Sequence, residues 1–273
     1  MKYLIPFDFS PVSQNAVDQA IKFVEFTGGE ISILHVVNDK ELYRRKDLQL
    51  KQYIESLGKH ENIIISGHVV VGNNLMDIGK IAEYHGIDLV MMGTHGVDAM
   101  QKIFGSNSMK IIRNSIVPFF IFQEGYKFKK LNKIVLPFSI ETKSMQVLRF
   151  ASKLSKLYDA EIHLIGRVQS DEYFRHSENT NILMASKFMK QEGVAFHFEI
   201  LDVSKGEFQE KVLEYCEKID SELIATTFYS DSLLPMFEKF VQNLIINKNH
   251  IPVLCINAET LMKVDSTLSF LTV

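Results

Sequence analysis

Two glycine-containing segments in the first half of the chain could hold an anion. Gly93-Thr94-His95-Gly96 follows an apolar run, and Gly105-Ser106-Asn107 opens the next predicted helix. Glycines let a ligand approach the backbone closely, and the N–H groups and positive dipole at a helix start attract phosphate without a lysine. The pattern predicts a phosphate cradle, although each glycine pair alone is also typical of a plain turn. His95 would either contact the phosphate or cap the loop.

The segments that must position this cradle alternate between short apolar runs and stretches of helical period. The apolar runs are residues 3–7, 31–37, 63–71, 89–92 and 117–122. They are nearly continuous, as expected of parallel strands buried on both faces. Ser10-Pro11 provides an N-cap and a first-turn proline for a helix reaching about Thr27, and Gly28-Gly29 would end it. The pattern predicts a doubly wound α/β sheet.

Ligands of such sheets bind beyond the carboxyl ends of the strands. The residues directly after the predicted strands are therefore the candidates for binding. In the first half they are Asp8, Val36, Gly72 and Gly93.

The second half of the chain repeats this pattern. Residues 4–37 align without a gap on residues 135–168, and Asp88-Leu89-Val90 corresponds to Glu222-Leu223-Ile224. A duplicated unit implies two similar folds. We therefore expect two tandem domains with five-stranded parallel sheets, over residues 1–125 and 130–273, joined by a short polar linker.

Composition excludes several classes of function. The 273 residues carry 30 Lys and Arg against 33 Asp and Glu, a formal net charge of −3, which lacks the basic field of a nucleic-acid binder. No apolar run approaches the roughly 18 residues that span a bilayer, so we expect a cytoplasmic protein without a membrane segment. The histidines and cysteines have no metal-ligand spacing, and no P-loop or catalytic serine motif occurs. Neither a metal site nor a catalytic residue is predicted.

The order and spacing of these motifs resemble the universal stress protein family over nearly all of both halves. The resemblance rests on Ile5-Pro6-Phe7-Asp8-Phe9-Ser10, on Leu34-His35-Val36, and on the block from Asp88 to Gly96 followed by Gly105-Ser106. The segment between Gly96 and Gly105 has eight residues, one fewer than the family pattern.

The resemblance implies that the first domain binds ATP or another adenine nucleotide. Asp8 and Val36 would hold the adenosine portion, Gly93 and Gly96 would lie along the ribose and phosphates, and Gly105-Ser106 would hold the phosphates. Mg²⁺ would come with the phosphates. The predicted nucleotide-binding residues are Pro6, Asp8, Val36, Met92, Gly93, His95, Gly96, Gly105, Ser106 and Asn107.

The second copy lacks most of these residues. The aligned pairs are Asp8 and Ser139, Gly93 and Thr227, Gly96 and Ser230, Gly105 and Lys239, and Ser106 and Phe240. Side chains there occupy the space that a phosphate would need. We therefore expect the second domain to be structural or partner-binding.

The sequence thus predicts a stress-response protein that binds a nucleotide and is not an enzyme, since no general base can be placed over a γ-phosphate. The alternatives are a scaffold that binds no nucleotide and a nucleotidyl-transferase-like enzyme. The resemblance also implies that the last strands of the two domains, near residues 117–122 and 252–256, join them as an intramolecular pseudo-dimer. A homodimer of the chain is the other assembly expected.

Overall fold

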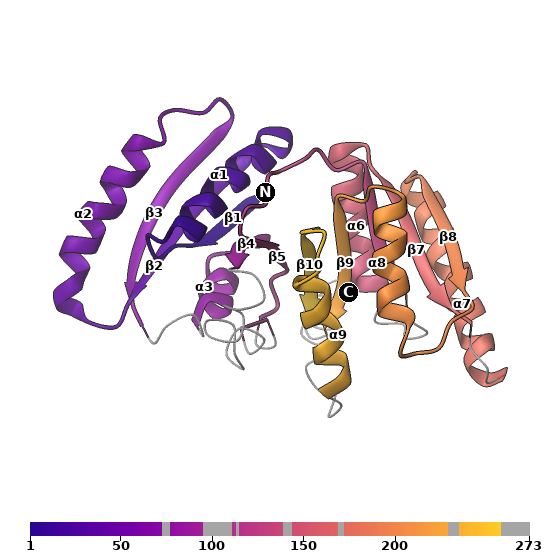
Figure 1. Cartoon of the computed structure of the whole chain (residues 1–273). Helices are drawn as coiled ribbons and strands as arrows, with labels where there is room; N and C mark the ends of the chain where they lie inside the picture. Colours follow the sequence, from indigo (N-terminus) through magenta and orange to yellow (C-terminus); the bar gives the residue numbers. More distant parts are fainter. Residues whose placement is uncertain are drawn as a thin grey trace, which may run out of the picture. The chain divides into compact units, whose positions relative to one another are not determined.

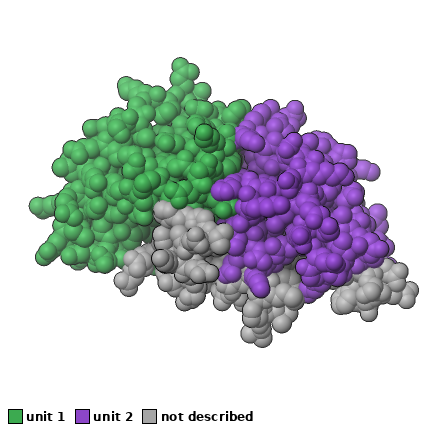
Figure 2. Space-filling view, viewed as in Figure 1, with its two compact units in different colours: residues 1–128 green, residues 129–273 purple. Residues whose placement is uncertain are grey.

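The computed structural model describes residues 1–72, 77–94, 111–112, 115–138, 144–168, 172–228 and 235–257. The chain forms two compact units, residues 1–128 and 129–273, which Figure 2 colours separately. Each unit is an α/β structure of alternating strands and helices (Figure 1). None of the described helices is both long and apolar enough to cross a bilayer.

Unit 1 contains a parallel sheet of five strands in the order β3-β2-β1-β4-β5. Its elements are β1 (Lys2–Pro6), α1 (Pro11–Thr27), β2 (Gly29–Val37), α2 (Lys40–Ser56), β3 (Ile63–Val71), α3 (Ile78–Tyr84), β4 (Leu89–Thr94) and β5 (Phe119–Gln123). The chain winds from β1 to one edge at β3, then returns past β1 to β4 and β5. Parallel strands wound in both directions from β1 are the arrangement of the predicted doubly wound fold, which is confirmed.

Helix α1 begins and ends where the sequence predicts. The Ser13 N–H donates to the Ser10 hydroxyl at 3.2 Å, and Pro11 occupies the first turn. At the other end, Gly28 has a φ of +62° and its N–H donates to the Val24 carbonyl at 2.7 Å. Glycine tolerates this backbone conformation without strain, so the chain can turn directly into β2.

Residues 126–128, which lie between the two predicted domains, pack on unit 1. The Phe128 N–H donates to the buried Gln19 Oε1 at 2.7 Å, and the Phe128 ring lies 5.7 Å from that of Phe23. The Tyr126 ring lies 5.2 Å from that of Phe122. These aromatic contacts make the segment part of unit 1.

Unit 2 repeats the strand order of unit 1, as β8-β7-β6-β9-β10, with every described pair parallel. Its elements are β6 (Lys133–Pro137), α6 (Ser144–Tyr158), β7 (Glu161–Arg167), α7 (Glu172–Glu192), β8 (Phe196–Leu201), α8 (Phe208–Lys218), β9 (Leu223–Phe228), α9 (Pro235–Ile245) and β10 (Val253–Asn257). In each unit, the first strand lies between the second strand and the fourth.

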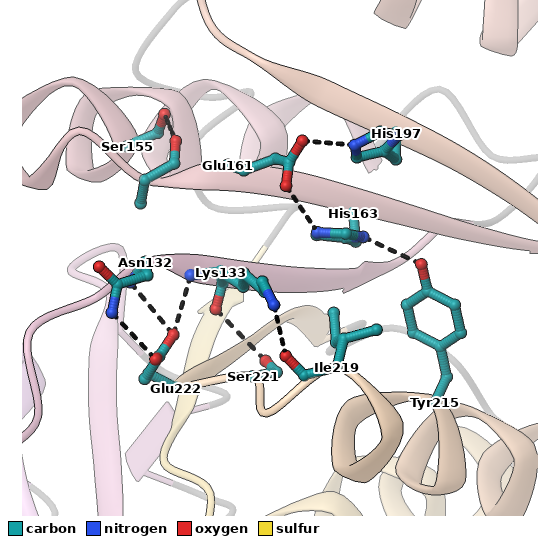
Figure 3. Close-up of polar contacts among 11 residues, drawn as sticks. Asn132, Lys133, Ser155, Glu161, His163, His197, Tyr215, Ile219, Ser221 and Glu222 are labelled. Carbon is teal, nitrogen blue, oxygen red and sulfur yellow. Dashed lines mark hydrogen bonds and ion pairs between the residues drawn. The ribbon is translucent and has the colours of Figure 1, made fainter.

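Both units use an acidic side chain to hold the start of this central strand. In unit 1 the Lys2 N–H donates to Asp88 Oδ2 at 2.8 Å. In unit 2 the aligned Glu222 accepts from the Lys133 N–H at 2.8 Å and from the Asn132 N–H at 3.1 Å, which Figure 3 shows. The two copies therefore keep the same contact at the amino-terminal edge of the sheet.

A polar cluster follows along the same edge of unit 2 (Figure 3). The Glu161 carboxylate lies 3.2 Å from His163 Nε2 and 2.5 Å from His197 Nε2. His163 Nδ1 lies 2.9 Å from the Tyr215 hydroxyl of α8. A carboxylate only accepts, so His163 donates from Nε2, and Nδ1 of the neutral ring accepts from the tyrosine. The cluster thus joins β7, β8 and α8.

The environment of His163 opposes its protonation. Burial lowers the pKa of His163 below its usual 6.5, and the nearby His197 and Lys133 lower it further, while Glu161 raises it. The folded state therefore binds this proton more weakly than the unfolded state does. The contribution of neutral His163 to the free energy of unfolding is therefore complete above the pKa that this histidine has in the unfolded chain. It is lost as the pH falls below about 6.5.

We expect the free energy of unfolding to fall between about pH 7 and about pH 5, and His163→Gln to reduce that fall. The glutamine amide can still donate to Glu161 but does not titrate. Urea denaturation at a series of pH values measures the effect. His176→Gln, at an exposed position of α7, is the matched control and should leave the slope unchanged. Equal slopes for the wild type and His163→Gln would contradict the assignment.

Candidate functional site

The carboxyl ends of β1, β2 and β4 meet at one edge of unit 1. Strand β1 pairs with β2 up to Pro6 and Leu34, and on its other side pairs with β4 at Tyr3 and Leu4. The loops after β1 and β4 therefore leave adjacent strands, at the point where the winding of the chain reverses. In open α/β sheets this switch point is where ligands bind.

Asp8 lies in the loop between β1 and α1 and is exposed at this edge. Its Oδ1 accepts from the Ser10 N–H at 2.9 Å, and its own N–H donates to Ser13 Oγ at 3.3 Å. Burial of part of the carboxyl would raise the pKa of Asp8, but hydrogen bonds from Ser10 and Ser13 outweigh it and lower the pKa below the usual 3.8. Asp8 is thus an anionic hydrogen-bond acceptor at neutral pH.

His35, on β2, contacts this loop. It was not among the residues predicted for the site. Its Nδ1 lies 2.7 Å from the Phe7 carbonyl oxygen, and its ring meets Phe9 edge-on with centroids 4.8 Å apart. Burial lowers the pKa of His35, so the ring is neutral at neutral pH. A carbonyl only accepts, which places the single proton on Nδ1.

Helix α2 contributes an aromatic ring and a cation to the same loop. The Phe7 ring stacks on Tyr53 with centroids 4.5 Å apart, and burial raises the pKa of Tyr53 to about 12. Lys46 Nζ lies 4.4 Å from the centroid of the Phe9 ring, a cation–π contact. The loop that carries Asp8 is therefore held by β2 and α2 together.

Val36 is half-buried near the end of β2 and borders the ends of two further elements. A Cβ placed on Gly72, after β3, would lie 3.6 Å from Val36 Cγ1 and 3.4 Å from Asp77 Oδ2, just before α3. Gly72 therefore lies next to Val36, whose apolar side chain is of the kind that a flat base can pack against.

Gly93 has a packing role in the described structure. A Cβ at Gly93 would come within 2.9 Å of Val12 Cγ1 and 3.1 Å of the Val12 carbonyl oxygen. The glycine therefore lets the first turn of α1 approach β4 closely. The sequence pattern predicted a close approach by a ligand, whereas this contact is with the helix that carries Ser10 and Ser13.

The neighbours of Gly93 on β4 are buried. Met92 is 7% exposed, and Thr94 is fully buried with an Oγ1 that has no hydrogen-bond partner in the described part of the chain. Pro6 is half-buried at the end of β1. A buried hydroxyl without a partner, at the end of the strand that leads into the predicted cradle, fits a polar ligand there.

The other predicted residues of the cradle, His95, Gly96, Gly105, Ser106 and Asn107, lie outside the described residues. The described structure thus brings Asp8, Val36, Pro6, Met92 and Gly93 to one edge. The phosphate-binding part of the site stays a prediction from the sequence.

The corresponding positions of unit 2 have different surroundings. Thr227, opposite Gly93, is buried in β9 and pairs with Ile256. The Phe240 ring on α9 lies nearly parallel to Phe208 of α8, with centroids 6.3 Å apart. Lys239 is exposed, while Ser139 and Ser230 lie outside the described residues. Phe240 is therefore engaged in packing between two helices.

Comparison with known proteins agrees with the fold and the motifs. The model of the universal stress protein family matches residues 1–123. Universal stress protein MJ0577 of Methanocaldococcus jannaschii is 28% identical over 147 residues, which cover 43% of this chain and 91% of that protein.

Two solved structures share the fold over most of the chain. A universal stress protein from Archaeoglobus fulgidus has a TM-score of 0.73 at 19% identity, covering 94% of this chain and 98% of its own. A functionally unknown protein from Pseudomonas aeruginosa PAO1 has a TM-score of 0.67 at 12% identity, covering 98% and 96%. Residues 1–123 therefore match the universal stress protein family, and the chain shares its fold with these two solved structures.

Proposed function

We propose that unit 1 binds an adenine nucleotide, ATP among the candidates, at the carboxyl edge of its sheet, and that the chain serves as a stress-response protein through this binding. The observation that carries the proposal is the anionic Asp8 carboxylate, held by Ser10 at the switch point. Val36, next to Gly72, provides the neighbouring apolar surface. An acceptor and an apolar surface side by side suit a nucleoside.

In this proposal the carboxylate of Asp8 accepts hydrogen bonds from the ribose hydroxyls. A charged acceptor forms stronger hydrogen bonds than a neutral one, so Asp8 favours a ligand with vicinal hydroxyls. The base packs beside Val36, and the phosphates extend toward the predicted cradle at Gly96, Gly105 and Ser106. Mg²⁺ accompanies the phosphates.

We propose binding and not catalysis as the activity of this site. In the described residues, the loop carries Asp8, which is held as an anion by hydrogen bonds. The buried His35 of β2 and Tyr53 and Lys46 of α2 contact the loop. We assign none of them as a general base for attack on a phosphate.

Unit 2 is proposed as the structural or partner-binding copy, because Phe240, which aligns with Ser106 in the sequence, packs on Phe208. The pseudo-dimer, the homodimer and the cytoplasmic location stay predictions.

The test is calorimetric titration of the full chain with ATP, AMP and adenosine. We expect about one site per chain, and Asp8→Asn to weaken binding roughly tenfold, about 1.4 kcal/mol, because the amide keeps the bond to Ser10 but loses the charge. Asp39→Asn is the matched control. Asp39 also accepts from the N–H two residues later, at 2.8 Å, and caps α2.

No binding of any of the three compounds would contradict the proposal and favour the scaffold alternative. A stoichiometry near two would show that unit 2 also binds. Unchanged affinity of a folded Asp8→Asn variant would remove Asp8 from the site.

A further inference from the structure

The peptide group between Phe7 and Asp8 is hydrogen-bonded at both ends. Its carbonyl, from Phe7, accepts from His35 Nδ1 at 2.7 Å, and the preceding peptide group is held by the Phe7 N–H, which donates to the Leu34 carbonyl at 2.8 Å. A peptide group is planar, so fixing the carbonyl also fixes the direction of the following N–H. That N–H belongs to Asp8 and points to Ser13 Oγ at 3.3 Å. The single imidazole bond therefore sets how Asp8 leaves the strand.

The next residue makes this support necessary. Phe9 has a φ of +68°, a left-handed conformation that costs energy for a residue with a side chain. Such a conformation persists only where surrounding contacts hold it. The contacts are the His35 ring, whose centroid lies 4.8 Å from that of Phe9, Lys46 Nζ, which lies 4.4 Å from the same centroid, and Gln14 Nε2, which donates to the Phe9 carbonyl at 3.0 Å.

His35 contributes to both restraints from a buried position. It is 9% exposed, and Phe7 is 4% exposed, so loss of the imidazole donor would leave a buried carbonyl without this partner. A buried unpaired carbonyl is costly, and the loop would move to restore a hydrogen bond. Movement of Phe7 or Phe9 would turn the Asp8 carboxylate, because Asp8 lies between them.

We infer that His35 is a positioning residue for ligand binding: its Nδ1–H, through the Phe7 carbonyl, and its ring, against Phe9, hold the Asp8 carboxylate in the direction that meets the ribose. The inference rests on the proposed function for its ligand. Strand β2 thus contributes two residues to the site: Val36 as an apolar contact for the ligand and His35 as the support of Asp8.

Two polar variants separate the donor from the bulk of the ring. In His35→Asn the amide nitrogen takes the place of Nδ1, whereas in His35→Gln it reaches the place of Nε2. We expect His35→Asn to bind ATP within about threefold of the wild type, and His35→Gln to bind roughly tenfold more weakly. His68→Gln is the matched control, since His68 is an exposed histidine of β3 whose ring bonds to Ser66. It should bind as the wild type does.

Amide hydrogen exchange without nucleotide provides a readout that does not depend on the proposed function. The Ser10 N–H, which donates to Asp8, should exchange roughly tenfold faster in His35→Gln than in His35→Asn. Equal exchange in the two variants, or equal losses of ATP affinity, would overturn the inference. If the wild type binds no nucleotide, the proposed function fails, and the exchange rates alone decide whether His35 holds Asp8.

Discussion

The parallel pairing of β1 with β2 on one side and β4 on the other is the constraint on which the candidate site depends. Because β1 is central, the three strand ends meet at one edge, and the loop to α1 must leave from the middle of it. Asp8 is on that loop. A carboxylate within the same strand would instead point to a face of the sheet, where Tyr3, Leu4 and Ile5 are buried.

Packing around the strand ends differs between the two units and affects which side chains lie at the carboxyl edge. Gly93 lets the first turn of α1 lie against β4, and the start of the same helix holds Asp8 through Ser10 and Ser13. Unit 2 keeps the strand order and the acidic contact at the start of the central strand, through Glu222 in place of Asp88. It has Thr227 where unit 1 has Gly93, and Phe240 packs on Phe208. The same framework therefore carries different chemistry at its edge in the two units.

The sequence predicted the strands and α1 well, because their signals are local. The apolar runs mark buried parallel strands, and Ser10-Pro11 and Gly28-Gly29 mark the ends of α1. The positions of Asp8 and Val36 followed from the strand ends. The contact of His35 with the Asp8 loop did not, since a histidine inside an apolar strand resembles a core residue and its partner Phe7 follows a different strand, β1.

Two further features depend on tertiary contacts that no local pattern shows. Gly93 was read as space for a ligand, but its neighbour is Val12, which is far from it in the sequence. The polar composition of the segment after β5 indicated a linker, yet Tyr126 and Phe128 pack their rings on unit 1.

The most direct measurement of the central claim is a titration of the isotopically labelled full chain with ATP, followed by amide chemical shifts in NMR spectra. If unit 1 binds the nucleotide, we expect the largest shifts at the amides of Asp8, Phe9 and Ser10 and near Val36, at the carboxyl edge of unit 1. Amides of β6 to β10 should change little. Shifts concentrated in unit 2, or at the amino-terminal edge near Lys2 and Asp88, would contradict it.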